Sequence, residues 1–284
     1  MPSPDGKFVA AAVAVDDHAA VEIWNIRDQR LEFTLGAESG TGDIIWSSNS
    51  TYVGQRSGGR VRLWDLGTGA VKGDLRLTNM VRYCSGDDDH HPDTIWIAGG
   101  DCRVAWACDD CGKLFICDVE NGTIGWSDFN DLDVSSDTKV IAFAPDGSYF
   151  VSNRAAGGMG RWDVTDVLTR GHPETATSIP PSPLWSTDGP MLTSIAVSFD
   201  QKWIVGFDVT KEILILNAQT GSYLYRILPD GIVESDSIKL HIIPSPDILR
   251  ISMMEDDRKC TIYSWRVLDA EITPAMPKSV TLDI

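Results

Sequence analysis

The chain has 284 residues, and 43% of them are hydrophobic, which is enough apolar side chain for a sizeable folded core. Its 24 Lys and Arg stand against 41 Asp and Glu, and the resulting net charge of −17 disfavours direct binding of DNA or RNA. No segment resembles a transmembrane helix, and six cysteines in a chain of this length do not indicate a disulfide framework.

The first repeated unit opens with the turn Ser3-Pro4-Asp5-Gly6-Lys7 and continues as an apolar strand from Phe8 to Val15. A second turn at Asp16-Asp17-His18 leads to a closing strand, Val21-Glu22-Ile23-Trp24-Asn25. Asp-Gly and similar pairs between apolar runs are hairpin signals, because these residues tolerate the backbone conformations of tight turns. This unit therefore predicts short strands joined by hairpins.

The same pattern recurs along the rest of the chain. The later closing strands are Val61-Arg62-Leu63-Trp64-Asp65, Leu114-Phe115-Ile116-Cys117-Asp118, Met159-Gly160-Arg161-Trp162-Asp163, Ile213-Leu214-Ile215-Leu216-Asn217 and Ile262-Tyr263-Ser264-Trp265-Arg266. The six closing positions are 25, 65, 118, 163, 217 and 266, so the spacing lies between 40 and 54 residues. A period of this length predicts a repeat architecture with four short strands in each unit.

These motifs resemble the WD-repeat (WD40) family of β-propellers. The resemblance is carried by the SPDGK and APDG turns, by RLWDLGTG and GRWDV at strand ends, and by CDVENGT, and it covers nearly the whole chain. It implies an all-β propeller of four-stranded antiparallel blades, six in number, formed as a single domain over residues 1–284. A fragment of a seven-bladed array is the alternative.

The family's Gly-His pair is absent from most units, so the hydrogen-bond network of the family is incomplete here. We therefore expect stability to depend on aromatic side chains buried between blades. The structural residues expected from the pattern are Trp24, Trp64, Asp65, Asp118, Trp162, Asp163 and Trp265.

The two ends of the chain carry complementary parts of one unit. The first unit begins at a turn and lacks its innermost strand, and Ser279-Ile284 has the composition of that strand. We expect it to close the ring as the inner strand of the first blade, with the segment from Glu271 to Met276 as the outer strand of the sixth. Closure would remove the open strand edges that invite association.

Acidic residues gather in the turns between second and third strands and in the loops between blades. In the geometry that the resemblance implies, these segments share one face. Its expected partner-binding residues are Asp16, Asp17, Asp87, Asp88, Asp89, Asp109, Asp110, Glu255, Asp256 and Asp257. Crowded carboxylates create a negative potential that attracts cations, although Asp also suits turns for structural reasons.

Three other features have both a functional and a structural interpretation. Trp185, near the end of the long connection from Gly171 to Pro190, is either a partner anchor or part of the outer strand of blade four. Cys108-x-x-Cys111 and the run from Asp87 to His91 contain possible metal ligands, but we expect buried thiols and a solvated connector instead. We expect no metal and no cofactor.

No nucleophile elbow, phosphate-binding glycine loop or metalloprotease motif is present in the sequence. We therefore expect a non-enzymatic scaffold in the cytoplasm or nucleus that binds a protein or peptide, with a basic one favoured by the charge. Two alternatives remain open: an enzyme or metal-binding protein that uses acidic residues at the channel mouth, and a sensor domain of a larger signalling protein.

Overall fold

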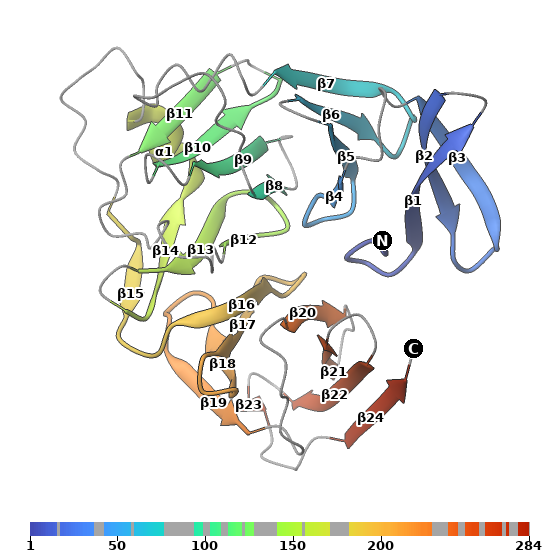
Figure 1. Cartoon of the computed structure of the whole chain (residues 1–284). Helices are drawn as coiled ribbons and strands as arrows, with labels where there is room; N and C mark the ends of the chain where they lie inside the picture. The colour runs from blue at the N-terminus through green and yellow to red at the C-terminus, as the bar shows by residue number, and fades with distance from the viewer. Residues whose placement is uncertain are drawn as a thin grey trace.

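The computed structural model describes sixteen segments of the chain, with the backbone alone described from residue 238 onward. They are residues 1–15, 18–36, 43–57, 60–76, 94–98, 103–108, 113–120, 123–127, 141–154, 157–170, 182–228, 238–243, 248–255, 259–268, 271–272 and 278–283. Antiparallel sheets follow one another around an axis in chain order, as in a β-propeller (Figure 1). The all-β propeller of four-stranded blades predicted from the sequence is thus confirmed.

The first blade contains three strands, and the second contains four. Blade one is β1 (Phe8–Val15), β2 (His18–Asn25) and β3 (Arg30–Gly36), and blade two is β4 (Asp43–Trp46), β5 (Tyr52–Ser57), β6 (Arg60–Asp65) and β7 (Val71–Arg76). Within these two blades each strand pairs with its neighbour in sequence, and the first strand of blade two, β4, lies nearest the axis (Figure 1).

Blades three and four are also four-stranded. Blade three is β8 (Thr94–Ala98), β9 (Arg103–Cys108), β10 (Lys113–Asp118) and β11 (Thr123–Ser127). Blade four is β12 (Ile141–Phe143), β13 (Tyr149–Asn153), β14 (Met159–Asp163) and β15 (Trp185–Thr187).

Blade five repeats the four-stranded pattern, and the last sheet has five strands. Blade five is β16 (Leu192–Val197), β17 (Trp203–Asp208), β18 (Ile213–Asn217) and β19 (Tyr223–Ile227). The last sheet is β20 (Ile238–Ile243), β21 (Ile248–Glu255), β22 (Lys259–Leu268), β23 (Glu271–Ile272) and β24 (Lys278–Asp283).

Three of the predicted turns, in blades one, two and five, share one hydrogen-bond pattern. In blade five the Ser198 hydroxyl donates to Asp200 Oδ1 at 2.7 Å, and the Trp203 backbone N–H donates to Ser198 Oγ at 2.9 Å. Equivalent pairs of bonds join Ser3, Asp5 and Phe8, and Ser47, Asn49 and Tyr52. The serine and the acidic or amide side chain thus fix the hairpin and satisfy backbone donors.

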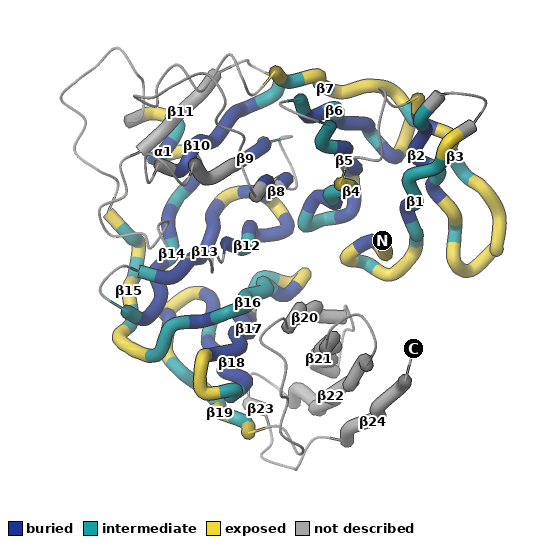
Figure 2. Tube along the Cα trace, in the orientation of Figure 1, coloured by how far each residue is buried: buried dark blue, intermediate teal, exposed yellow. Residues whose placement is uncertain are grey.

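The closing aromatic of a blade packs against the blade before it. Trp162 lies in a cluster with Leu114 and Ile116 of blade three and stacks on Phe150, with ring centroids 5.4 Å apart. Cys117, which occupies the corresponding position of blade three, is buried with residues of blade two. Figure 2 shows this burial along the strands between blades.

One expected burial is wrong. Trp64 and Trp162 are buried, but the Trp24 side chain is 40% exposed and its indole N–H donates to Glu22. The closing aromatic side chains pack against the preceding blade. Trp24 belongs to the first blade, so its ring faces away from blade two. The side chain of Trp265 lies outside the described residues.

The expected ring closure is also wrong. β24 pairs with β22, with Leu282 opposite Cys260, so the C-terminal strand joins the last sheet instead of the first blade. β23 pairs with the far end of β22, so the expected outer strand from Glu271 to Met276 is described only at Glu271–Ile272. Long β22 offers a complete outer edge, and the adjacent C-terminal segment reaches it by a short connection.

A helix interrupts blade four, where the pattern favoured only strands. α1 (Val164–Arg170) follows β14 directly, and Asp163 Oδ1 accepts a hydrogen bond from the Asp166 backbone N–H at 2.9 Å. Asp163 is therefore a helix N-cap. Val164 and Val167 are buried in the cluster between blades three and four, which holds the helix against the propeller.

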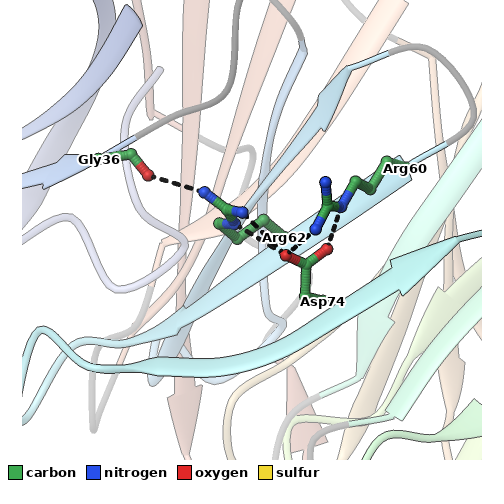
Figure 3. Close-up of polar contacts among 4 residues, drawn as sticks. All are labelled: Gly36, Arg60, Arg62 and Asp74. Atoms are coloured by element: carbon green, nitrogen blue, oxygen red, sulfur yellow. Dashed lines mark hydrogen bonds and ion pairs between the residues drawn. The ribbon is translucent and has the colours of Figure 1, made fainter.

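A polar contact joins the outer strand of blade one to β6 of blade two (Figure 3). Arg60 and Arg62 of β6 both donate to the carboxylate of Asp74 in β7, and Arg62 Nη1 also donates to the Gly36 carbonyl at 3.4 Å. Burial alone would raise the pKa of Asp74, but the hydrogen bonds from the two guanidinium groups hold it below its usual value.

Candidate functional site

A central cavity of about 410 Å³ lies between the innermost strands of blades two to five. Its wall is formed by Met1, Pro2, Pro4, Ile44, Ile45, Trp46, Ser48, Ile95, Ile97, Ile141, Ala142, Phe143, Ile195, Ala196 and Val197. Nearly all of these side chains are apolar. The cavity is therefore suited to an apolar group of a partner or ligand.

Polar contacts hold the innermost strands close together around the cavity. Ser47 forms a parallel bridge to Ile97, and the Ser48 backbone N–H donates to the Ile97 carbonyl at 3.3 Å. The Ser48 hydroxyl donates to the Ala144 carbonyl at 3.0 Å, which ties blade two to blade four. These polar contacts fix the strands, and the apolar side chains between them line the open space.

The start of the chain forms another part of the wall. Pro2 bridges to Val9 beside the inner edge of β1, and the Trp46 indole N–H donates to the Met1 carbonyl at 3.1 Å. Residues 1–4 thus occupy part of the position that an innermost strand has in the other blades.

Most of the acidic residues predicted to bind a partner lie outside the described part of the chain. These are Asp16, Asp17, Asp87, Asp88, Asp89, Asp109, Asp110, Asp256 and Asp257. Glu255 is the last residue of β21, and only its backbone is described. Cys111 and the run from Asp87 to His91 lie outside it as well, and no group of three metal-ligating side chains occurs among the described residues.

Trp185 lies in β15, the outer strand of blade four, opposite Arg161 of β14. Its indole N–H donates to the Ala218 carbonyl at 3.1 Å, and its ring covers Gly221, where a Cβ would lie 2.5 Å from the ring. These contacts favour the structural interpretation of Trp185, a side chain that joins blades four and five.

The aspartates of the closing strands have structural contacts. Asp65 Oδ1 accepts hydrogen bonds from the backbone N–H and the hydroxyl of Thr68, and Asp118 is buried at the end of β10. Asp163 caps α1, as described above. These residues shape turns and a helix start in the described structure.

The cavity wall was not identified from the sequence as a site. The innermost strands were recognised as apolar runs, but which of their side chains reach the axis depends on how the blades tilt and pack. Alternation alone assigns residues to two faces of a strand and does not reveal a space between strands.

Comparison with solved structures shows the fold. The β-propeller domain of Cps50 (Swd1) from Myceliophteria thermophila is similar with a TM-score of 0.59 and 12% identity, over 99% of this chain and 84% of that one. A chain of the mitotic checkpoint complex has a TM-score of 0.57 and 16% identity, over 97% of this chain and 78% of that one. No protein-family model and no curated protein sequence matches the chain.

The described part of the chain contains no helix with the length and apolar character needed to cross a membrane. Its one described helix, α1, has seven residues.

Proposed function

We propose that this chain is a single WD-repeat propeller of six blades that serves as a non-enzymatic platform for protein–protein interaction. Six sheets succeed one another in the described residues, and a Ser-x-Asp or Ser-x-Asn turn recurs in blades one, two and five. A rigid ring of this kind presents loops and an axial surface to a partner without needing any motion of its own.

The central cavity is the observation that carries this proposal. It is about 410 Å³ in volume, and its wall is formed chiefly by isoleucine, alanine, valine and aromatic side chains. An apolar anchor of a partner gains free energy on entering such a space, at about 25 cal/mol for each Å² removed from water. We propose that one apolar side chain of an extended partner segment enters there.

The charge of the chain supports a basic partner. At −17 it attracts cations over long range, and the proposed contact residues are the acidic groups predicted from the sequence, Asp87, Asp88 and Asp89 among them. We propose that these groups bind cationic residues of the partner. We also propose that the chain acts inside the cell, an expectation that comes from its sequence.

Selection from a displayed random peptide library, followed by calorimetry of the selected peptides, tests the proposal. We expect enrichment of Lys and Arg next to one apolar residue, and an affinity that falls as salt rises, because exposed charges are screened within about 10 Å at 0.1 M. The triple variant D87N/D88N/D89N should bind more weakly than the wild type.

A matched control has the same change of charge at other sites. Asp28, Glu120 and Asp188 are exposed, and the variant D28N/E120Q/D188N should keep most of the affinity. Selected peptides without a basic preference, or equal affinities for the two triple variants, would contradict the basic-partner proposal.

A further inference from the structure

A second space, the inter-blade pocket, lies between blades four and five at the turns that follow the innermost strands. It has a volume of about 410 Å³, and its wall includes Tyr149, Arg161, Asp200, Lys202, Trp203 and Leu224. The central cavity is lined by other residues, so the two spaces are distinct. Pockets for small ligands have volumes of roughly 300–1,000 Å³.

The wall contains a buried hydroxyl group without a partner. The Tyr149 side chain is only 2% exposed, and its Oη makes no hydrogen bond. Buried polar groups are nearly always paired, because an unpaired one loses its water without compensation. Burial raises the pKa of Tyr149 to about 12, so the hydroxyl keeps its proton and can donate.

The guanidinium group of Arg161 supplies a second unmatched donor. Its Cζ lies 3.8 Å from the centroid of the Tyr149 ring, and its Nη1 donates to the Ala218 carbonyl at 3.0 Å. Its Nε is buried and makes no hydrogen bond. The contacts already made fix the plane of the group, so the free N–H is held in place beside the pocket.

The carboxylates near the pocket are already engaged. Asp200 Oδ1 accepts from Ser198 Oγ and from the Lys202 backbone N–H, and Asp146 Oδ1 accepts from the backbone N–H and hydroxyl of Ser148. Lys202 Nζ lies 3.7 Å from Asp200 Oδ2, and its side chain is 70% exposed. Among the wall residues, the buried side-chain atoms without a partner are Tyr149 Oη and Arg161 Nε, and both can donate. Lys202 adds an exposed cation at the rim.

We propose that the inter-blade pocket binds a small anion that carries a carboxylate or phosphate group, with Tyr149 Oη and Arg161 Nε donating to its oxygens. Lys202 completes the site from the rim, and the apolar surfaces of Trp203 and Leu224 contact the rest of the ligand. Ionised acceptors form the strongest hydrogen bonds with such donors. The site goes beyond the proposed platform function and does not depend on it.

Isothermal titration of the whole chain with inorganic phosphate, and separately with succinate, tests the proposal. We expect one site per chain for at least one of the two anions, and the preferred anion shows which head group the pocket takes. Tyr149→Phe removes only the hydroxyl, so it should weaken binding about tenfold or more. It should leave the unfolding midpoint of the ligand-free protein unchanged or raise it, because no hydrogen bond is lost.

Matched positions in other blades provide the controls. Lys7 is the counterpart of Lys202: its Nζ lies 3.1 Å from Asp5 Oδ2, and its side chain is 72% exposed. Lys202→Gln should weaken anion binding several-fold, by loss of one exposed charge, whereas Lys7→Gln should not. Tyr52 begins β5 as Tyr149 begins β13, and Tyr52→Phe should bind the anion as the wild type does.

Failure of both anions to bind would overturn the proposal. It would also be overturned if an anion bound with equal affinity to the wild type and to Tyr149→Phe, or if Lys7→Gln weakened binding as much as Lys202→Gln. Anion binding is measured without any peptide, so its failure is distinct from failure of the platform function.

Discussion

Asn153 and Leu192 form a closed pair of hydrogen bonds between blades four and five. The Asn153 side-chain amide donates to the Leu192 carbonyl at 2.7 Å, and the Leu192 backbone N–H donates to Asn153 Oδ1 at 3.1 Å. Both residues are buried. The side chain of Asn153 therefore hydrogen-bonds the backbone of Leu192 as a neighbouring strand would. This pairing fixes the residue at which β16 begins.

Replacement of Asn153 by Ala leaves the Leu192 N–H and carbonyl unpaired in the core. We expect the free energy of unfolding in urea to fall by about 2–4 kcal/mol, since each buried unpaired group costs roughly 1–3 kcal/mol. Asn217 makes similar bonds to the backbone N–H groups of Gln219 and Thr220, but in an exposed turn. Asn217→Ala should cost about 1 kcal/mol or less, because water replaces its bonds. Equal losses of stability for Asn153→Ala and Asn217→Ala would show that burial of the Asn153–Leu192 pair does not strengthen its contribution.

The two tryptophans Trp162 and Trp24 should differ in their effect on stability. Trp162→Ala removes a fully buried ring from between two blades and should cost about 3–5 kcal/mol. Trp24 is 40% exposed, so Trp24→Ala removes less buried surface and encloses no cavity; we expect roughly 1–2 kcal/mol. Denaturant unfolding measures both. A loss at Trp24 as large as at Trp162 would mean that another blade covers it.

Asp74 links stability to pH through its contacts with Arg60 and Arg62. Its pKa in the folded chain lies below the usual value, so the unfolded chain binds more protons at acid pH and stability rises with pH there. The contribution is complete above the usual Asp pKa of about 3.9 and is lost as the pH falls through the lower folded value. Asp74→Asn should therefore reduce stability at pH 6, and its effect should shrink as the pH falls below the usual Asp pKa.

The control variant changes Asp28, which is exposed and whose Oδ2 lies 4.0 Å from Arg30 Nε. Asp28→Asn should reduce stability at pH 6 by less than Asp74→Asn does, because exposed ion pairs contribute little. If Asp74→Asn lowered stability by the same amount at every pH, the charge of Asp74 would not be the cause.

The register of β24 can be tested with one new cysteine. Leu282 stands opposite Cys260 of β22, and directly opposite residues have Cβ atoms about 4.5–5.5 Å apart, close enough for a disulfide after small adjustment. Under mild oxidation, Leu282→Cys should link to Cys260, and peptide mass mapping should identify the pair. The double variant with Cys260→Ser should lack this link. A link from position 282 to another cysteine would contradict the pairing with β22.

Local signals in the sequence predicted the parts of the fold that depend on neighbouring residues. Ser198, Asp200 and their equivalents encode a turn within a few residues, and the apolar closing strands encode the faces that meet between blades. The position of Ser279-Ile284 could not be predicted in this way. The composition of this segment suits a strand in the first blade or in the last sheet. Which of the two it joins depends on the free edge of β22, and the sequence of the segment carries no information about that edge.

The candidate binding sites could likewise be predicted only in part from the sequence. Clusters of acidic residues can be recognised directly in the sequence, whereas no sequence pattern marks Tyr149 and Arg161 as site residues. Their importance appears only when blades four and five enclose them and leave their donors unmatched. Trp24 was expected to be buried like Trp64 because the two occupy equivalent positions, and only the direction in which blades pack distinguishes them.

Filling the central cavity provides the clearest test of partner binding at the axis. Ala196 lies in the cavity wall, and Ala196→Leu adds three carbon atoms to the space proposed for the partner's apolar anchor. The exposed Ala70 lies away from the cavity, so Ala70→Leu is the matched control. With a selected basic peptide, calorimetry should show about tenfold weaker binding for Ala196→Leu, or ~1.4 kcal/mol, at an unchanged unfolding midpoint. Equal affinity for Ala196→Leu, Ala70→Leu and the wild type would show that the partner does not enter the cavity.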